Sequence, residues 1–350
     1  LLLGIKEVQK NDLIPNKKYL FFSHVIKKQP YNRELLRTIL KKNIQLIDWE
    51  CLTGKNSQRI IAFGRYAGIV GAYNGILTFG KRQKLFDLKP AHQCNDLDEM
   101  KQEYKKIFTL SSSKKLSNLK IAVTGGGRVA KGAMEVFCGM NIRKVITEEF
   151  LNDHFVNPVY VQLHSKDYNR RKIRNSKSEI RNPKSEWDSN HFYKNPQAYE
   201  STFYKFTGVT DLLIAAAYWN PKAPVLFTTE DMRKDGFKIR IIADVTGDIE
   251  GSIPSTKKFS SIDDPVYDYN PITGELEQPF SNEKNISVMA IDNLPCELPK
   301  DASKDFGTQM INNVLPNMIV KDKDGIIKRA TIAKQGKLTS RYAYLKDYVE

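Results

Sequence analysis

The sequence predicts an α/β fold whose strands form parallel sheets with helices on both faces. Short, predominantly apolar segments recur along the chain, at residues 211–217, 239–245 and 286–292. Segments with helical spacing of apolar residues lie between other strands, and a glycine-rich turn joins a strand to a helix at residues 124–127. Strands that are apolar on both faces are typical of parallel sheets covered on both sides.

The first third of the chain alternates short strands with a helix. We expect strands at residues 1–5, 19–23, 44–48 and 59–63, and we expect the first of them to be buried. Residues 33–42 place Leu and Ile side chains at helical spacing, which predicts an amphipathic helix. These elements suggest that the chain begins inside a first α/β domain.

Two further features bear on the organisation of this region. Residues 64–72 are rich in small side chains and predict a helix that packs closely against its neighbours, suited to a place between domains. The chain starts with Leu1, in a strand that no turn precedes. We therefore expect an N-terminal segment upstream of Leu1.

A strand, a turn and a helix follow one another directly in the second region. Residues 119–123 are apolar, residues 124–127 are glycine-rich, and residues 129–137 have helical spacing. A second strand is expected at residues 143–146. Together with the three strands named above, this order predicts a parallel α/β sheet covered on both faces.

Composition narrows the class of protein. The 350 residues are 41% hydrophobic and 27% charged, which is globular rather than disordered composition. The four cysteines form no C-x-x-C pair, so we expect no metal site built on cysteine, and free thiols in a reducing, cytoplasmic compartment. The longest apolar runs fall far short of the roughly 18–20 residues that span a bilayer. No membrane association is therefore predicted.

The net charge of +15 raises the question of a nucleic-acid partner. Residues 170–186 carry a net +5, a third of this charge, and contain a tandem repeat in which residues 173–179 (IRNSKSE) are followed by residues 180–186 (IRNPKSE). One apolar residue per heptad excludes a coiled coil. We interpret the repeat as a solvated insertion in a loop and do not favour nucleic-acid binding.

The glycine-rich turn has the chemistry of a phosphate site. Gly125 and Gly127 let the backbone turn tightly and approach a pyrophosphate, and Arg128 and Val129 open the helix whose free N–H groups face the anion. The spacing G-x-G-x-x-x-x-G departs from the usual G-x-G-x-x-G. An ordinary tight turn between strand and helix is the alternative interpretation.

An acidic residue after the second strand is expected to hold the ribose. Glu148 lies about 20 residues beyond Gly127, where a carboxylate would bind the 2′-hydroxyl. Arg143 and Lys144 lie close by and suit a 2′-phosphate instead. The sequence therefore leaves NAD and NADP both open as the cofactor.

Lys6 and His24 form a second candidate site. Each lies at or just past the carboxyl end of an expected strand, the edge at which open α/β sheets bind ligands. A lysine in an apolar setting serves as a base, and histidine exchanges protons near neutrality. The alternatives are a surface lysine and a core histidine whose hydrogen bonds are satisfied.

Several blocks of sequence follow one another in the order of a known family. They are residues 4–7 (GIKE), 22–24 (FSH) with Lys27, 46–50 (LIDWE), 59–68 (RIIAFGRYAG), 123–133 (VTGGGRVAKGA), 243–245 (ADV) through 251–253 (GSI), and 291–295 (IDNLP) with 298–299 (LP). They resemble the lysine-forming saccharopine dehydrogenases, and more closely the lysine–ketoglutarate reductase half of the bifunctional aminoadipic semialdehyde synthases. Alanine dehydrogenases and nicotinamide nucleotide transhydrogenases are more distant relatives.

The resemblance implies two Rossmann-like domains with the active site in the cleft between them. Residues 1–66 with 308–350 would form the substrate-binding, catalytic domain. Residues 67–307 would bind the dinucleotide and carry the basic insertion at about 170–186. The family also has a substrate-binding arginine upstream of the position that Leu1 occupies here.

The implied reaction is an NAD(P)-dependent oxidation at a CH–NH group. Saccharopine gives up a hydride, the resulting imine is hydrolysed, and lysine and 2-oxoglutarate leave; the reductase direction reverses these steps. Lys6 and His24 would share the proton transfers. Glu7 and Glu50 would tune them, because nearby carboxylates favour the charged form of a cation.

Further roles follow from the same resemblance. Lys27 and Arg59 would hold substrate carboxylates, although surface salt bridges are the alternative for both. Phe63 would border the cleft at its hinge. The cofactor contacts at the nicotinamide would come from the loop after the last apolar strand, namely Ile291, Asp292 and Leu294.

Two other functions stay open at this point. One is a related dehydrogenase acting on a smaller amino acid such as alanine, and the other is a non-catalytic dinucleotide-binding homologue that lacks part of the site. The sequence does not indicate an oligomeric state.

Overall fold

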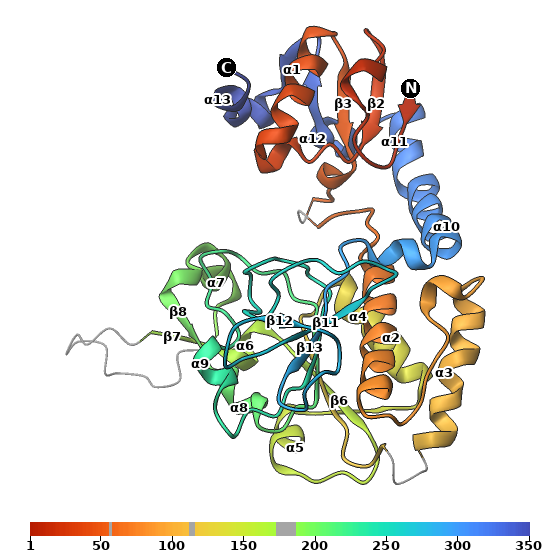
Figure 1. Cartoon of the computed structure of the whole chain (residues 1–350). Helices are drawn as coiled ribbons and strands as arrows, with labels where there is room; N and C mark the ends of the chain where they lie inside the picture. The colour runs from red at the N-terminus through yellow and green to blue at the C-terminus, as the bar shows by residue number, and fades with distance from the viewer. Residues whose placement is uncertain (56–57, 112–115, 173–186) are drawn as a thin grey trace, which may run out of the picture. The chain divides into compact units, whose positions relative to one another are not determined.

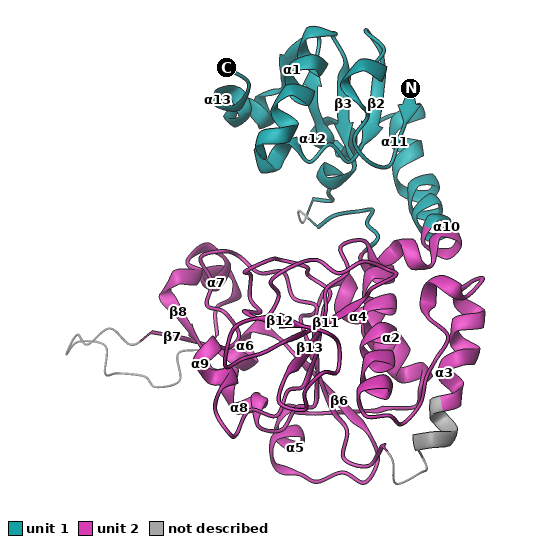
Figure 2. Ribbon diagram, in the orientation of Figure 1, with its two compact units in different colours: residues 1–63, 303–350 teal, residues 64–302 magenta. Residues whose placement is uncertain are grey.

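A computed structural model describes residues 1–55, 58–111, 116–172 and 187–350. The chain divides into two compact units, residues 1–63 with 303–350 and residues 64–302 (Figure 2). The sequence-based domain boundaries lay after residues 66 and 307. The repeat at residues 173–186 lies outside the described residues.

Unit 1, residues 1–63 with 303–350, is built on a five-stranded sheet in the order β1-β2-β3-β14-β15 (Figure 1). The first three strands are parallel, and β14 runs antiparallel to both β3 and β15. The strands are β1 (Leu2–Leu3), β2 (Lys18–Phe21), β3 (Gln45–Asp48), β14 (Thr331–Lys334) and β15 (Lys337–Leu338).

The helices of unit 1 cover this sheet. In α1 (Arg33–Lys41) the buried residues are Leu35, Leu36 and Ile39, which follow the spacing expected of an amphipathic helix. The other helical segments are η1 (Lys10–Asp12), η2 (Val25–Lys27), η3 (Pro30–Asn32), η4 (Trp49–Cys51), η9 (Met310–Val314), α11 (Leu315–Ile319), α12 (Ile326–Ala330), η10 (Ser340–Leu345) and α13 (Lys346–Val349).

Two predictions for unit 1 are wrong. The first strand is exposed rather than buried, since Leu2 and Leu3 are 36% and 51% exposed; β1 lies at the edge of the sheet and pairs with β2 alone among the described strands. Residues 59–63 form no strand in the described chain, where Arg59 makes a single bridge to Thr53. Their apolar character has another cause: Ile61 is fully buried in the core of unit 1 from a loop.

Unit 2, residues 64–302, contains an eight-stranded sheet in the order β12-β11-β13-β10-β9-β4-β6-β5. The six strands from β13 to β5 are parallel, whereas β11 and β12 run antiparallel. The strands are β4 (Lys120–Thr124), β5 (Arg143–Val145), β6 (Val159–Leu163), β9 (Leu212–Ala215), β10 (Ile241–Asp244), β11 (Val266–Tyr269), β12 (Leu276–Glu277) and β13 (Ile286–Met289), with a separate hairpin of β7 (Asn169–Arg171) and β8 (Tyr199–Ser201).

The predicted fold class is confirmed: both units are α/β, and the central strands of unit 2 are parallel and almost entirely buried. The strands that were not predicted are β6, β7, β8, β11 and β12 of unit 2 and β14 and β15 of unit 1. The helical segments of this part of the chain are α2 (Gly64–Arg82), η5 (Ala91–Gln93), α3 (Leu97–Ser111), α4 (Arg128–Gly139), α5 (Thr147–Asn152), α6 (Ser165–Tyr168), α7 (Ser189–Lys194), η7 (Pro196–Ala198), α8 (Tyr204–Thr207), α9 (Thr229–Met232), η8 (Leu294–Glu297) and α10 (Pro299–Gln309).

Helices α2 and α4 pack against each other at backbone distance (Figure 1). A Cβ atom on Gly68 of α2 would lie 1.9 Å from the Val129 carbonyl oxygen, and one on Gly132 of α4 would lie 2.0 Å from the Arg65 carbonyl oxygen. No side chain fits at either position. The close packing expected of residues 64–72 is thus confirmed, and it fixes the helix that follows the glycine-rich turn.

Among the described residues, no helix is both long and apolar enough to cross a membrane.

Candidate functional site

The glycine-rich turn of unit 2 follows the carboxyl end of β4. Gly125 has a φ of +99°, and a Cβ there would lie 2.9 Å from the Ala216 carbonyl oxygen, so both conformation and space require glycine. Its N–H donates to the Leu163 carbonyl at 2.8 Å, which ties the turn to β6. At Gly127, by contrast, a Cβ would meet nothing within 4 Å. Open space therefore lies above this glycine.

The start of α4 supplies the donors of an anion site. Gly127 is the N-cap, and Arg128 and Val129 are the first helical residues of a twelve-residue helix. The first N–H groups of a helix have no partner within it, and the helix dipole favours negative charge there. The four predicted residues at this turn are thus placed where a pyrophosphate could be bound by backbone.

An aromatic pocket opens beside the turn. It has a volume of about 180 Å³ and is lined by Thr124 at the end of β4 and by loops that follow β6 and β9. Five aromatic residues line it, namely Tyr168, Phe192, Tyr193, Tyr218 and Trp219. We call it the ring pocket. This pocket was not predicted from the sequence, because its rings come from segments up to 51 residues apart in the chain.

The strand order changes which residues approach the turn. Glu148 begins α5 after β5, but β6 lies between β5 and β4. The side chain that reaches the turn is that of His164, directly after β6: a Cβ on Gly126 would lie 2.9 Å from its ring. The run of apolar residues at 159–163 (VYVQL) was the signal that could have revealed this strand.

A hydrogen-bonded chain runs from β5 to the turn. Lys144 Nζ donates to Gln162 Oε1 at 2.8 Å, and Gln162 Nε2 donates to the Gly125 carbonyl oxygen at 3.0 Å. Because the lysine occupies the amide oxygen, it orients the amide nitrogen toward the turn. This contact ties Gly125 to the edge strand of the sheet.

The loop after β13 carries the other expected cofactor contacts. Ile291 bridges to Ser260 and is buried, as is Leu294, whose side chain would lie 3.4 Å from a Cβ on Gly71 of α2. Asp292 is exposed. Of the three residues predicted in this loop, only the aspartate therefore has an exposed side chain.

In unit 1 the predicted acid–base residues lie after the carboxyl ends of β1 and β2. His24 has a φ of +52°, and its Nδ1 hydrogen-bonds Glu7 Oε1 at 2.5 Å. Burial raises the pKa of Glu7, but the hydrogen bond and charge of His24, with the charge of Lys6, outweigh it and hold the pKa below its usual value. Lys6 itself is exposed. The structure thus brings three of the predicted residues together.

A second carboxylate–cation pair follows β3. Arg59 donates to Glu50 Oε1, and the Glu50 N–H donates to Asp48 Oδ1 at 2.7 Å. The other carboxylate oxygen of Glu50 is buried and has no hydrogen-bond partner within the part of the chain that the structure describes. Asp48, which also accepts from the Ser23 N–H and hydroxyl, has its pKa raised by burial. It fixes the ends of β2 and β3 that carry the site.

Aromatic rings lie beside these charges. Phe63 stacks on Phe306 with centroids 4.4 Å apart, and Phe22 stacks on the His24 ring at 6.1 Å. Phe22 also contacts Phe63 at 6.4 Å. Lys27, in η2, is exposed and has no side-chain partner among the described residues. Phe63 and His24 are therefore joined through one ring, whereas Lys27 faces solvent.

We compared the chain with known proteins. It is similar to alpha-aminoadipic semialdehyde synthase over nearly its whole length. It is 28% identical over 369 residues to that of Arabidopsis thaliana, covering 99% of this chain and 35% of the relative. It is likewise 28% identical to the mitochondrial one of Mus musculus, covering 99% of this chain and 41% of the relative. The chain thus spans about two fifths of the length of these relatives.

Other comparisons agree with the resemblance seen in the sequence and support the fold. The saccharopine dehydrogenase (NAD(+), L-lysine-forming) of Candida albicans is 23% identical, with 90% of this chain and 74% of the relative covered. A solved structure of L-alanine dehydrogenase superposes with a TM-score of 0.54 at 12% identity, covering 99% of this chain and 80% of the other, so the two share a fold. No family model matches the chain.

Proposed function

We propose that this chain is an NAD(P)-dependent oxidoreductase that interconverts saccharopine with L-lysine and 2-oxoglutarate. The observation that carries the proposal is the contact of His24 with Glu7, next to Lys6, at the carboxyl edge of the parallel strands of unit 1. The names of the relatives and the shared fold support the same reaction class. Together they favour an enzyme over a passive binding protein.

The reaction needs a proton carrier at each step. Bound NAD(P) supplies a nicotinamide that accepts or returns a hydride at the carbon next to nitrogen. Hydride leaves this carbon readily only when the secondary amine is neutral, so a base must first take the ammonium proton. We assign that exchange to Lys6 because it lies near Glu7, the partner of His24, although its side chain is exposed in unit 1 rather than in the apolar setting expected from the sequence. In the hydrolysis of the imine, water adds to carbon, and a proton moves from the added water to nitrogen before the carbon–nitrogen bond breaks.

His24 is the second proton carrier in this proposal. Its Nδ1 is held by Glu7, which fixes the ring and leaves the other ring nitrogen to face the substrate. Glu7 also stabilises the protonated ring when it forms. Lys27, exposed and unpaired among the described residues, would bind a substrate carboxylate. Arg59 already contacts Glu50 and offsets its charge. We therefore assign Arg59 to positioning the Glu50 carboxylate rather than to binding a substrate carboxylate.

The geometry of unit 2 fits a dinucleotide. The open space above Gly127 and the donors at the start of α4 suit the pyrophosphate, and the ring pocket suits the adenine. A volume near 180 Å³ is smaller than pockets for whole ligands, which span roughly 300–1,000 Å³, and fits a single ring system.

We also propose that the cofactor is NADP(H). The residues that follow β6 beside the turn are His164, Ser165 and Lys166. They offer positive or neutral donors to a 2′-phosphate, whereas Glu148 lies one strand further out. The nearby carboxylate of Asp167 is occupied, because it accepts from the His164 N–H at 2.7 Å as part of a capping box.

One assay tests both parts of the proposal. Oxidation of NADPH and of NADH is followed with lysine plus 2-oxoglutarate, and with pyruvate plus ammonia as the control pair. We expect turnover with the first pair, and a kcat/KM for NADPH about tenfold or more above that for NADH. Absence of turnover with lysine plus 2-oxoglutarate overturns the reaction, and a preference for NADH overturns the cofactor assignment.

A further inference from the structure

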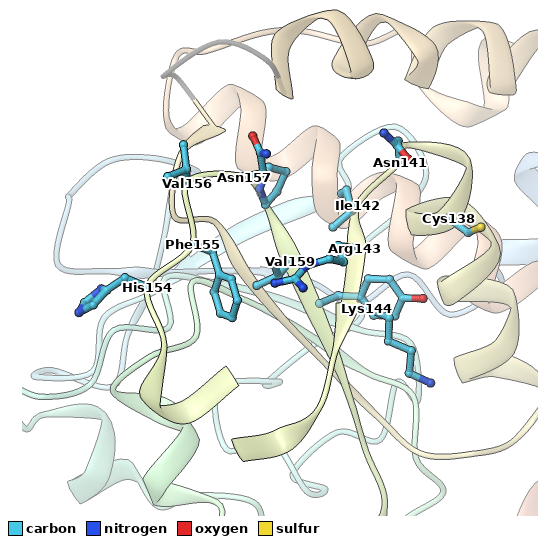
Figure 3. Close-up of a pocket in the computed structure, with 12 residues that line it drawn as sticks. Cys138, Asn141, Ile142, Arg143, Lys144, His154, Phe155, Val156, Asn157 and Val159 are labelled. Carbon is cyan, nitrogen blue, oxygen red and sulfur yellow. The ribbon is translucent and has the colours of Figure 1, made fainter. Parts of the chain in front are cut away.

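A second pocket lies at the opposite edge of the unit 2 sheet from the glycine-rich turn. It has a volume of about 870 Å³ and is lined where β5 and β6 begin, by the chain after α4 and by the loop of residues 154–157 (Figure 3). The strands are parallel, so their starts face away from the carboxyl ends at which the turn is found. We call it the amino-edge pocket.

The lining of this pocket carries one sign of charge. Its twelve residues include Arg143, Lys144 and His154, together with Asn141 and Asn157, and none of the twelve is an aspartate or glutamate. The side chains of arginine, lysine and asparagine and the N–H of a histidine ring are all hydrogen-bond donors to an anion. The pocket therefore has the chemistry of an anion site.

Arg143 is the group best placed to bind an anion. Its guanidinium lies over the ring of Phe155, 5.3 Å from the centroid, and Figure 3 shows the two side chains facing each other within the pocket. In the described part of the chain no carboxylate pairs with it. Stacking on a buried ring holds the guanidinium plane in one orientation and leaves its edge donors for a ligand.

The ends of neighbouring helices do not explain this charge. The last carbonyls of α4 are already occupied, since Phe137 and Cys138 accept from the N–H groups of Ile142 and Asn141. At the end of α5, Lys120 Nζ donates to the carbonyls of Phe150 and Asp153 at 2.7 and 2.8 Å. Arg143 is thus not needed as a cap for either helix.

The pocket is connected to the glycine-rich turn through Lys144. This lysine lines the pocket but directs its ammonium away from Arg143 (Figure 3), to Gln162, which in turn donates to the Gly125 carbonyl. We propose that the amino-edge pocket binds a small anion, carboxylate or phosphate, through Arg143, and that its binding weakens dinucleotide binding. An anion draws the Lys144 ammonium into the pocket, Gln162 loses its fixed orientation, and Gly125 loses a hydrogen bond.

Binding to the pocket is tested without the dinucleotide. Inorganic phosphate and malonate are titrated separately into the whole chain by calorimetry, at an ionic strength held constant with chloride. We expect one of the two, or both, to bind, and Arg143→Gln to weaken that binding about tenfold or more. Arg171→Gln, which removes an exposed arginine of the same unit outside the pocket, is the matched control and is expected to bind as the wild type does.

The coupling rests on the proposed dinucleotide function and is measured second. The Kd of NADPH is determined with and without the anion that binds. We expect the anion to raise it about fivefold in the wild type and in Arg171→Gln, and not in Arg143→Gln. By linkage, NADPH weakens anion binding by the same factor.

Each other outcome has a definite meaning. Failure of both anions to bind the wild type overturns the site, whatever the dinucleotide does. A rise in the NADPH Kd that persists in Arg143→Gln shows direct competition at the glycine-rich turn and overturns the coupling. Binding of the anion at Arg143 without an effect on NADPH also overturns the coupling. If NADPH itself does not bind, the proposed function fails, and calorimetry still decides the pocket.

Discussion

The candidate site of unit 2 is made mostly of backbone and rings, and that of unit 1 is made of paired charges. At the glycine-rich turn the requirement is the absence of side chains, as at Gly125, where both φ and space exclude a Cβ. In unit 1 the requirement is a pair of side chains, such as His24 and Glu7. Under the proposed function, the unit 2 site should therefore be sensitive to added side chains and the unit 1 site to the loss of a charged partner.

The largest expected effect comes from a substitution that disrupts the packing of α2 against α4 in unit 2. Gly132→Val places a side chain where a Cβ alone would lie 2.0 Å from the Arg65 carbonyl oxygen, so α2 and α4 must separate. Overpacking of this kind costs about 3 kcal/mol or more. We expect loss of cooperative unfolding of unit 2 in thermal melts. Gly127→Ala, where a Cβ meets nothing, is the control, and a stable Gly132→Val protein would contradict the close helix packing.

Substitutions in the charged site of unit 1 are expected to lower the turnover rate and to leave NADPH affinity nearly unchanged. Lys6→Met and His24→Gln each remove one of the proposed proton carriers, and we expect turnover to fall about 100-fold or more. NADPH affinity, measured by fluorescence, should stay within a factor of about two, since neither residue lies in unit 2. Equal losses of turnover and of affinity would remove both residues from the catalytic role.

The ring pocket is expected to show the opposite pattern. Tyr218 lines it and is 85% exposed, so Tyr218→Ala should leave the unfolding temperature unchanged. Stacking of a base on an aromatic ring contributes about 1–3 kcal/mol, so the NADPH Kd should rise about tenfold. Tyr31→Ala, which removes an exposed tyrosine of unit 1, serves as the control. An unchanged Kd for Tyr218→Ala would place the adenine elsewhere.

The same contrast explains what the sequence could predict. A glycine turn is encoded within a few residues, and Gly125, Gly127 and the helix after them were found from spacing alone. Apolar strands were found for the same reason. The order of the strands in a sheet, by contrast, depends on residues far apart in the sequence. Here β6 lies between β4 and β5, and for this reason His164 rather than Glu148 reaches the turn.

Pairs and pockets were the hardest to predict from residues alone. The contact between Glu7 and His24 joins residues 17 positions apart, and it was expected only through the family resemblance. The aromatic lining of the ring pocket had no such guide. Exposure of the first strand also depends on sheet order, because Leu2 and Leu3 lie at an edge that their apolar sequence does not reveal.

The smallest expected effect is that of Glu7→Gln, which removes the charge of Glu7 and keeps the shape of its side chain. Because the folded pKa of Glu7 lies below the ordinary value of 4.5, its ionised form stabilises the fold above that pH, and this contribution is lost as the pH falls through the folded pKa. The difference in unfolding free energy between the wild type and Glu7→Gln should therefore shrink as the pH falls from 6 toward 3, because the Glu7 carboxylate becomes protonated over this range.

Glu275→Gln is the matched control for this titration, since its carboxylate is exposed and has no partner among the described residues. We expect its stability to follow that of the wild type across the range. A difference for Glu7→Gln that stays constant with pH would mean that Glu7 acts through packing. In that case the His24 contact would be a structural hydrogen bond, and the proton-transfer role of unit 1 would rest on Lys6 alone.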